Sequence, residues 1–185
     1  MSTILPMSKV PWRSVRSSTF TTRQLTAVIQ SETSVLYKQI LLGLKKRGFG
    51  VNKWNGFGGK VEANETILVA AARELKEECC LTAKPSDLKN IGHLEFTFEG
   101  EPTLMDVRVF STAIFEGTPT ETDEMAPRWF NNEDIPYMDM WPDDKLWFPY
   151  MLKGKKFFGK FHYEDGHAYF HIVHKWVFLP NTGAN

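Results

Sequence analysis

Several features that would direct this chain of 185 residues to a membrane, a nucleic acid or an oxidising compartment are missing from its sequence. No apolar run approaches the ~20 residues that cross a bilayer, so we expect no membrane partner. The 22 basic residues equal the 22 acidic residues, so no overall positive field predicts a nucleic-acid partner. The only two cysteines are the neighbours Cys79 and Cys80, which cannot form an ordinary structural disulfide, and this favours a reducing compartment.

Acidic residues are also absent from the first 23 residues, which carry four basic residues and nine serines and threonines. This composition is typical of mitochondrial transit peptides, although a disordered tail or an upstream start before Met7 would have the same composition. A secretory signal is not expected, because no apolar h-region is present. We therefore expect a cytoplasmic protein, with mitochondrial or nuclear localisation as alternatives.

Hydrophobic periodicity predicts short strands and two helices in the rest of the chain. Two closing strands are expected on either side of the turn Glu164-Asp165-Gly166. One helix is predicted at residues 66–79, where Asn64 or Thr66 can serve as the cap, and the other at residues 145–152. The remaining predicted strands are residues 25–29, 40–44, 92–98, 105–110 and 129–130.

These elements fit one domain. A glycine-rich loop at residues 48–59 leads into the first helix. Residues 1–22 are expected to be a leader or a disordered tail, residues 23–178 the domain, and residues 179–185 a C-terminal tail. The fold class predicted from this pattern is mixed α/β (α+β), with helices packed on a central mixed sheet.

Three glutamates follow helical spacing in the first predicted helix. Glu74, Glu77 and Glu78 stand at positions i, i+3 and i+4, which places their carboxylates on one helix face. Like charges on one face are destabilising unless a cation lies between them, and hard divalent ions choose oxygen ligands and work with phosphates. The cluster therefore indicates a metal site for phosphate chemistry. On this cluster alone, a solvated acidic face paired with Lys76 is the alternative.

The residues around this cluster have a fixed spacing. Five residues separate Gly59 from Glu65, seven more separate Glu65 from Arg73, and Glu74-Leu75-Lys76-Glu77-Glu78 follows without a break. This stretch resembles the signature of the Nudix hydrolase family at every fixed position except the last glycine, where Cys80 stands. A helix-ending residue in the left-handed region is usually glycine or asparagine, so Cys80 is expected to cost about 1 kcal/mol there.

The resemblance implies an α/β/α sandwich and a hydrolase that uses Mg²⁺, with Mn²⁺ as the alternative ion. Glu78 is our first choice, and Glu77 our second, for the carboxylate that accepts a proton from the attacking water. Arg73 is expected to hold a carboxylate in place, and Lys45 to neutralise phosphate charge or shape the pocket. The implied metal ligands are the Gly58 carbonyl, Glu74, Glu77, Glu78 and, in a loop outside the signature, Glu124.

Further blocks extend the resemblance over most of residues 23–163, to the animal MutT homologues that act on oxidised purine nucleoside triphosphates. Substrates of the 8-oxo-dGTP and 2-hydroxy-dATP type would then be hydrolysed to a nucleoside monophosphate and pyrophosphate, which sanitises the nucleotide pool. The implied partner is a small-molecule nucleoside triphosphate, and a monomer is expected. The blocks are residues 43–50 with 54–60, 100–102 with 104–107, and 139–144 with 147–149.

Two alternatives remain for the function. The first is a Nudix pyrophosphatase for another nucleoside diphosphate derivative, such as ADP-ribose or a dinucleoside polyphosphate, which the block Trp141-Pro142-Asp143-Asp144 disfavours. The second is a nucleotide-binding module without turnover. Such a module would normally lose a carboxylate of the cluster, and none is lost here.

The resemblance implies a purine pocket, and the residue types suit one. Trp141 offers a stacking face, and Asn55 carries both a donor and an acceptor. Asp143 and Asp144 cannot both stay ionised cheaply, so one is expected to be protonated, and exchange of that proton would let the pocket read two kinds of damaged purine. A helix cap is the alternative for this pair. The other implied substrate-binding residues are Thr26, Lys45, Phe49, Phe57, Gly58, Gly59, Lys60, Phe96, Met105, Pro142 and Trp147, while Phe98 is assigned to the core.

Overall fold

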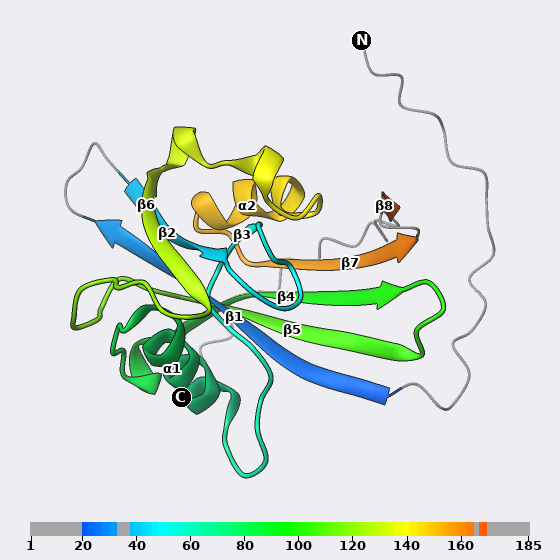
Figure 1. Cartoon of the computed structure of the whole chain (residues 1–185), viewed down its shortest axis with the longest axis horizontal. Helices are drawn as coiled ribbons and strands as arrows, with labels where there is room; N and C mark the ends of the chain where they lie inside the picture. The colour runs from blue at the N-terminus through cyan, green and yellow to red at the C-terminus, as the bar shows by residue number, and fades with distance from the viewer. Residues whose placement is uncertain (1–19, 33–37, 165–166, 170–185) are drawn as a thin grey trace.

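A mixed sheet of eight strands forms the centre of the part of the chain that the computed structural model describes, residues 20–32, 38–164 and 167–169 (Figure 1). Its order is β3-β2-β1-β5-β4-β7-β8, and β6 pairs with β2. The pairs β1–β5 and β4–β7 are parallel, and the other pairs are antiparallel. The strands are β1 (Phe20–Glu32), β2 (Lys38–Lys45), β3 (Trp54–Asn55), β4 (Lys89–Phe98), β5 (Thr103–Thr112), β6 (Met125–Asn131), β7 (Phe157–Glu164) and β8 (His167–Tyr169).

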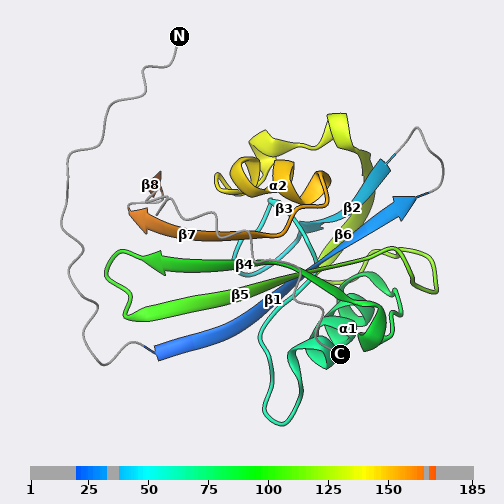
Figure 2. The same cartoon turned by 180° about the vertical axis from the view of Figure 1, so that it is seen from behind.

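Two helices cover opposite faces of this sheet, as Figures 1 and 2 show. They are α1 (Ile67–Cys79) and α2 (Asp144–Leu152). Single 3-10 turns lie at Pro85–Asp87, Asn132–Asp134 and Tyr137–Asp139. The predicted α/β/α sandwich on a mixed sheet is confirmed. Among the described residues, neither helix has the length and apolar character that a membrane span requires.

Alternation along β1 and β2 divides the core between the two helices. Val28 and Ile40 face the cluster that contains α2, whereas Ile29 and Leu41 face the cluster that contains α1. All four side chains are fully buried. Because successive side chains of a strand point to opposite faces, a sheet covered on both sides reads as an apolar run. This explains why residues 25–29 and 40–44 could be predicted as strands.

The predicted elements are present, and the strands extend further than predicted. The glycine-rich loop contains the short strand β3, which pairs with β2. Helix α1 is capped by Thr66, whose hydroxyl accepts the Val69 N–H at 3.3 Å, while Asn64 lies in a left-handed turn with φ 69°. Strand β6 is longer than predicted because its whole length pairs with β2. The turn at residues 165–166, residues 1–19 and the C-terminal tail lie outside the described residues, whereas residues 20–22 of the predicted leader belong to β1.

Cys80 ends α1 in the left-handed region, with φ 63° and ψ 13°, and its N–H donates to the Lys76 carbonyl at 3.2 Å. A Cβ atom is strained there, so we expect Cys80→Gly to raise the free energy of unfolding by about 1 kcal/mol, or the melting temperature by about 2–4 °C. Urea denaturation of both proteins measures this. Cys80→Ala is the matched control, because alanine keeps the Cβ atom. An equal gain in both variants would show that the thiol, and not the backbone, is responsible.

Candidate active site

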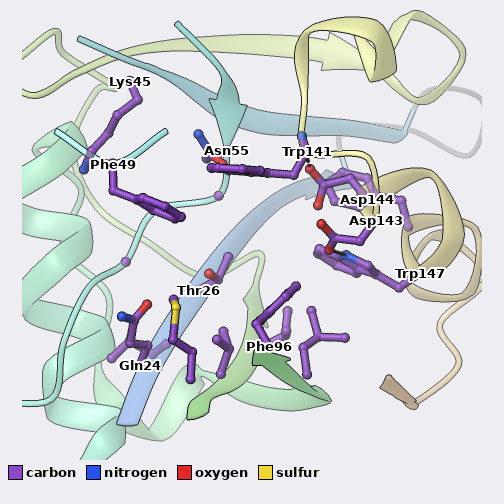
Figure 3. Close-up of a pocket in the computed structure, with 18 of the residues that line it drawn as sticks. Gln24, Thr26, Lys45, Phe49, Asn55, Phe96, Trp141, Asp143, Asp144 and Trp147 are labelled. Carbon is purple, nitrogen blue, oxygen red and sulfur yellow. Dashed lines mark hydrogen bonds between the residues drawn. The ribbon is translucent and has the colours of Figure 1, made fainter. Parts of the chain in front are cut away.

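One cavity of about 170 Å³ opens on the α2 side of the sheet and reaches the glycine-rich loop before α1. Its walls come from β1, β2, β4, β5, the first residue of β6, β7, the loop at residues 49–58 and the start of α2. Figure 3 shows Lys45 at one end, and Asp143, Asp144 and Trp147 at the other. The cavity therefore joins two chemically different ends.

Glu78 lies at the charged end, where it is only 3% exposed. One carboxylate oxygen accepts the Gly58 N–H at 2.8 Å, and the other accepts the Lys45 ammonium at 3.0 Å. Lys45 also pairs with Glu124, and Arg47 approaches Glu124 at 3.4 Å. Helix α1, β2 and the loop before β6 thus meet at one buried cation. The structure brings Glu124 into the cluster, as the resemblance implied.

Arg73 holds the acidic face of α1 against the loop. Its guanidinium donates to both oxygens of Glu65 at 2.8 and 3.2 Å, to Glu74 at 2.9 Å and to Glu77 at 3.0 Å. It also reaches the Lys60 carbonyl at 3.2 Å. A planar guanidinium suits several fixed carboxylates, so Arg73 has the positioning role that the sequence predicts. These bonds raise the pKa of Arg73 and lower that of Glu65.

The pKa values of the ionisable groups in this cluster shift in different directions. Burial raises the pKa values of Glu78 and Glu74 above the usual range of a glutamate. The charge of Lys45 opposes this increase at Glu78, and that of Arg73 opposes it at Glu74. Glu124 differs, because its hydrogen bond to Lys45 lowers its pKa. Burial disfavours the charged Lys45, but Glu124 and Glu78 outweigh that effect and raise its pKa. The site therefore stabilises a positive charge between the buried Glu78 and the partly exposed Glu124.

The donor set fits a hard divalent cation. Glu74, Glu78 and Glu124 supply oxygen atoms, and the Lys45 ammonium already occupies a cationic position between two of them. In this conformation, no three acidic, histidine or cysteine side chains of the described chain enclose an ion. An ion would therefore have to displace Lys45 from Glu78 and Glu124. The contact that Gly58 makes here is through its N–H, which orients Glu78.

Aromatic and apolar side chains build the other end of the cavity. Trp141 stacks on Phe49 with ring centroids 5.0 Å apart, and Lys53 lies over the Trp141 ring at 5.3 Å. Asn55 lies beside Trp141 (Figure 3), and its side-chain amide donates to the Lys53 carbonyl at 2.9 Å. The amide oxygen thus keeps its capacity to accept from a ligand. Of the predicted residues, Thr26, Phe96, Met105 and Trp147 also line this cavity.

Asp143 and Asp144 are 3% and 7% exposed. Asp143 accepts the Trp147 indole N–H at 3.1 Å and the Tyr163 hydroxyl, and Asp144 accepts the Trp141 backbone N–H at 3.0 Å. Asp143 stands at the cap position of α2 without a side-chain capping bond, so the helix-cap alternative is wrong for it. Burial raises the pKa of both carboxyl groups. The increase is larger for Asp144, because the charge of Asp143 raises its pKa further.

Four residues implied to bind substrate do not line the cavity. Phe57 is fully buried in the core cluster of α1, and Lys60 is exposed. Gly59 faces α1, where an added Cβ would lie 2.5 Å from a Glu74 oxygen. Pro142 is half-buried between Trp141 and Asp143. These residues support the loop and the start of α2, whereas Gly58 does line the cavity.

Several cavity residues were missed by the sequence analysis. Phe98 packs against the core cluster of α2, as expected, but it also lines the cavity, because Phe96 and Phe98 share one face of β4. The same two-residue spacing from Phe96, Met105 and Thr26 would have found several of the others. Tyr163 cannot be found in this way, since only the pairing of β7 with β4 brings it there. The missed lining residues are Gln24, Leu25, Gly56, Leu94, Phe98, Val107, Val109, Met125, Phe148 and Tyr163.

The comparisons agree with this geometry. The NUDIX domain matches residues 23–151, so the chain belongs to the Nudix family. Its members generally need a divalent metal cation, and this chain is a hydrolase of that family.

Two curated relatives carry the name oxidized purine nucleoside triphosphate hydrolase. The mouse protein is 52% identical over 128 residues, which are 69% of this chain and 81% of the relative. The zebrafish protein is 51% identical over 148 residues, which are 80% of this chain and 90% of the relative. Among solved structures, the MutT protein of Bacillus halodurans matches with a TM-score of 0.67 and 25% identity, covering 80% of this chain and 94% of that one.

Proposed function

We propose that this chain is a Mg²⁺-dependent pyrophosphohydrolase that converts oxidised purine nucleoside triphosphates to nucleoside monophosphates and pyrophosphate, and so sanitises the nucleotide pool. The observation that carries the proposal is the arrangement of the cavity. Lys45 and Gly58 line one end and contact Glu78 of the carboxylate cluster, and an aromatic pocket with a buried aspartate pair lies at the other end. The names of the mouse and zebrafish relatives support the same substrate class.

At the end of the cavity near Lys45, different residues have different roles in breaking the phosphoanhydride bond. A bound Mg²⁺, or Mn²⁺, would offset negative charge on the phosphate oxygens and lower the pKa of a bound water. Glu78, whose carboxylate is held between the Gly58 N–H and the Lys45 ammonium, accepts the proton of the attacking water. Lys45, once released from Glu78 and Glu124, provides a positive charge for the triphosphate. Arg73 keeps Glu74 and Glu77 in place.

At the other end, the pocket recognises the base. Trp141 stacks on the purine, and such stacking is worth about 1–3 kcal/mol per base. Asn55 reads one edge with its amide. Of the aspartate pair, the protonated member donates to a carbonyl or ring nitrogen, and the ionised member accepts from an N–H group. Exchange of the proton between them would admit both an 8-oxoguanine-like edge and a 2-hydroxyadenine-like edge.

The test is pyrophosphate release over a panel of normal and oxidised purine triphosphates with Mg²⁺. We expect kcat/KM for at least one oxidised purine to exceed that for dGTP and dATP by about tenfold or more, since one well-placed hydrogen bond is worth about 1.4 kcal/mol or more. Equal rates for dGTP and every damaged purine would refute the sanitising role but spare the chemistry. Faster hydrolysis of ADP-ribose would favour a different Nudix pyrophosphatase.

Removing divalent cations with a chelator is expected to abolish pyrophosphate release, and adding Mg²⁺ back is expected to restore it. Undiminished turnover in chelator would contradict the metal-dependent mechanism. Binding of nucleotides without any turnover in Mg²⁺ would instead favour the non-catalytic module.

We also propose that the enzyme acts as a monomer in the cytoplasm, with residues 1–22 as a candidate mitochondrial leader. Light scattering of the purified protein and the destination of a fluorescent protein fused to residues 1–22 test these two points.

A further inference from the structure

The two buried aspartates of the cavity have different hydrogen-bond partners. Asp143 receives two side-chain donors from different parts of the fold, the Trp147 indole N–H of α2 at 3.1 Å and the Tyr163 hydroxyl of β7. Asp144 receives a backbone donor, the Trp141 N–H, at 3.0 Å, and it shares the Trp147 indole with Asp143, so the Tyr163 hydroxyl is the side-chain donor that Asp143 alone has. Donors stabilise the charged form of a carboxyl group, so this asymmetry favours a negative charge on Asp143.

Tyr163 is built firmly into this position. It is 6% exposed, its ring stacks on Phe98 with centroids 5.4 Å apart, and it meets Trp141 edge-on at 6.0 Å. Burial and the neighbouring charge of Asp143 raise the pKa of Tyr163, so the phenol keeps its proton. A neutral phenol that is fixed by its ring can only donate to a carboxylate in this geometry. Its hydroxyl therefore acts as a permanent donor to Asp143.

We propose that Tyr163 is a specificity-determining positioning residue, which keeps the negative charge on Asp143 and thereby leaves the shared proton on Asp144. The proposal rests on the function proposed above and deepens it. Asp144 becomes the carboxylic acid that donates to an acceptor on the purine, and Asp143 becomes the carboxylate that accepts from an N–H group. The pocket then has a preferred hydrogen-bond polarity. Reversing it requires the negative charge to move from Asp143, which the Tyr163 hydroxyl stabilises, to Asp144.

The other groups that face the pair do not reverse this polarity. Lys53 favours an ionised Asp144 through its charge, but its ammonium donates to the Met140 carbonyl at 3.3 Å and lies over the Trp141 ring. Tyr137 is neutral, because burial and the charge of Asp144 raise its pKa. Asp143 and Asp144 themselves repel each other's charge, which is why one proton is retained by the pair.

Tyr163→Phe tests the proposal, because it removes the hydroxyl and keeps the ring. The hydroxyl stabilises the ionised Asp143, so its loss raises the pKa of that carboxyl group. We expect the acid limb of kcat/KM, which reports the free enzyme, to move upward by about one pH unit. The ratio of kcat/KM for 8-oxo-dGTP and 2-hydroxy-dATP is expected to change by about threefold or more, while kcat changes less. Wild type and variant are compared over the pH range in which carboxyl groups titrate.

Two further variants separate charge placement from packing. Trp147→Phe removes the other side-chain donor and is expected to move the acid limb in the same direction. Tyr137→Phe removes a buried phenol that packs on Phe148 and is expected to leave the acid limb unchanged. If Tyr163→Phe leaves both the acid limb and the substrate ratio at wild-type values, Tyr163 serves packing alone and the proposal is overturned. A matching shift in Tyr137→Phe would also overturn it.

The pH dependence of binding, measured by calorimetry with 8-oxo-dGMP as the probe, does not require turnover. We expect the affinity of Tyr163→Phe to fall at a pH about one unit higher than that of wild type. If the wild-type enzyme releases no pyrophosphate from oxidised triphosphates, the proposed function fails, whatever this titration shows. If it does release pyrophosphate and the binding titrations of the two proteins coincide, only the role of Tyr163 fails.

Discussion

Replacing Glu78 with glutamine is expected to lower kcat by about a thousandfold while the protein stays folded. The carboxylate is buried, with one oxygen on the Gly58 N–H and the other on Lys45. A glutamine can still accept from Gly58, so the loop keeps its anchor. Its amide cannot take a proton from water and brings no negative charge to a cation. Single-turnover pyrophosphate release, together with the melting temperature, measures the two effects separately.

Two glutamates provide matched comparisons for Glu78→Gln. Glu121 is a surface acid paired with Lys46, and Glu121→Gln is expected to leave kcat within about twofold of wild type, since surface pairs contribute little. The Glu77 side chain is 57% exposed and paired with Arg73, so Glu77→Gln is expected to cost less than Glu78→Gln. If Glu78→Gln retains turnover while Glu77→Gln loses it, the proton acceptor is Glu77 and our assignment is wrong.

Replacing Gly58 with alanine is expected to lower both stability and activity. An added Cβ would lie 2.0 Å from the Leu25 carbonyl oxygen and 3.0 Å from the Thr26 Cα, and both are backbone atoms of β1. The loop must move away from β1, which strains the bonds Leu25 N–H to Gly59 O and Ala27 N–H to Phe57 O. We expect a loss of about 3 kcal/mol in the free energy of unfolding.

The same displacement moves the Gly58 N–H away from Glu78, and a misplacement of about 1 Å costs about a hundredfold in rate. Urea denaturation and kcat measure the two losses. Gly48→Ala is the control, because Gly48 has φ 75° but nothing within 4 Å of an added Cβ. It is expected to cost only the backbone strain, about 1 kcal/mol, and to leave kcat near wild type. A Gly58→Ala protein with the stability and rate of Gly48→Ala would contradict the close approach of the loop to β1.

The chemistry of the charged end could be predicted because it depends on local spacing. Helical periodicity alone places Glu74, Glu77 and Glu78 on one face, and residues 67–79 do form α1, with Thr66 as its cap. The left-handed conformation of Cys80 followed from the missing glycine of the signature. Asn64 as a cap could not be excluded from sequence, because the turn that precedes Thr66 depends on how the loop returns to β1.

The far end of the cavity was only partly predictable, because its residues come from separate strands. Alternation predicts which side chains share one face of a strand. Applied to residues 94–98 it groups Phe98 with Phe96, and applied to residues 105–109 it groups Val107 and Val109 with Met105. Which strands become neighbours is a different matter. Strand β7 pairs with β4, and this pairing alone brings Tyr163 to the aspartates at the start of α2.

The sequence by itself determined the spacing of the Nudix signature, which implies the reaction, and the shared face of Glu74, Glu77 and Glu78, since a helix repeats every few residues. Only the tertiary structure decided two further points. Lys45 lies between Glu78 and Glu124, so a cationic side chain already occupies the acidic site. Tyr163 donates to Asp143 and not to Asp144, so the buried pair has a polarity. Both depend on contacts between elements far apart in the chain, which sheet order and packing establish and local periodicity cannot.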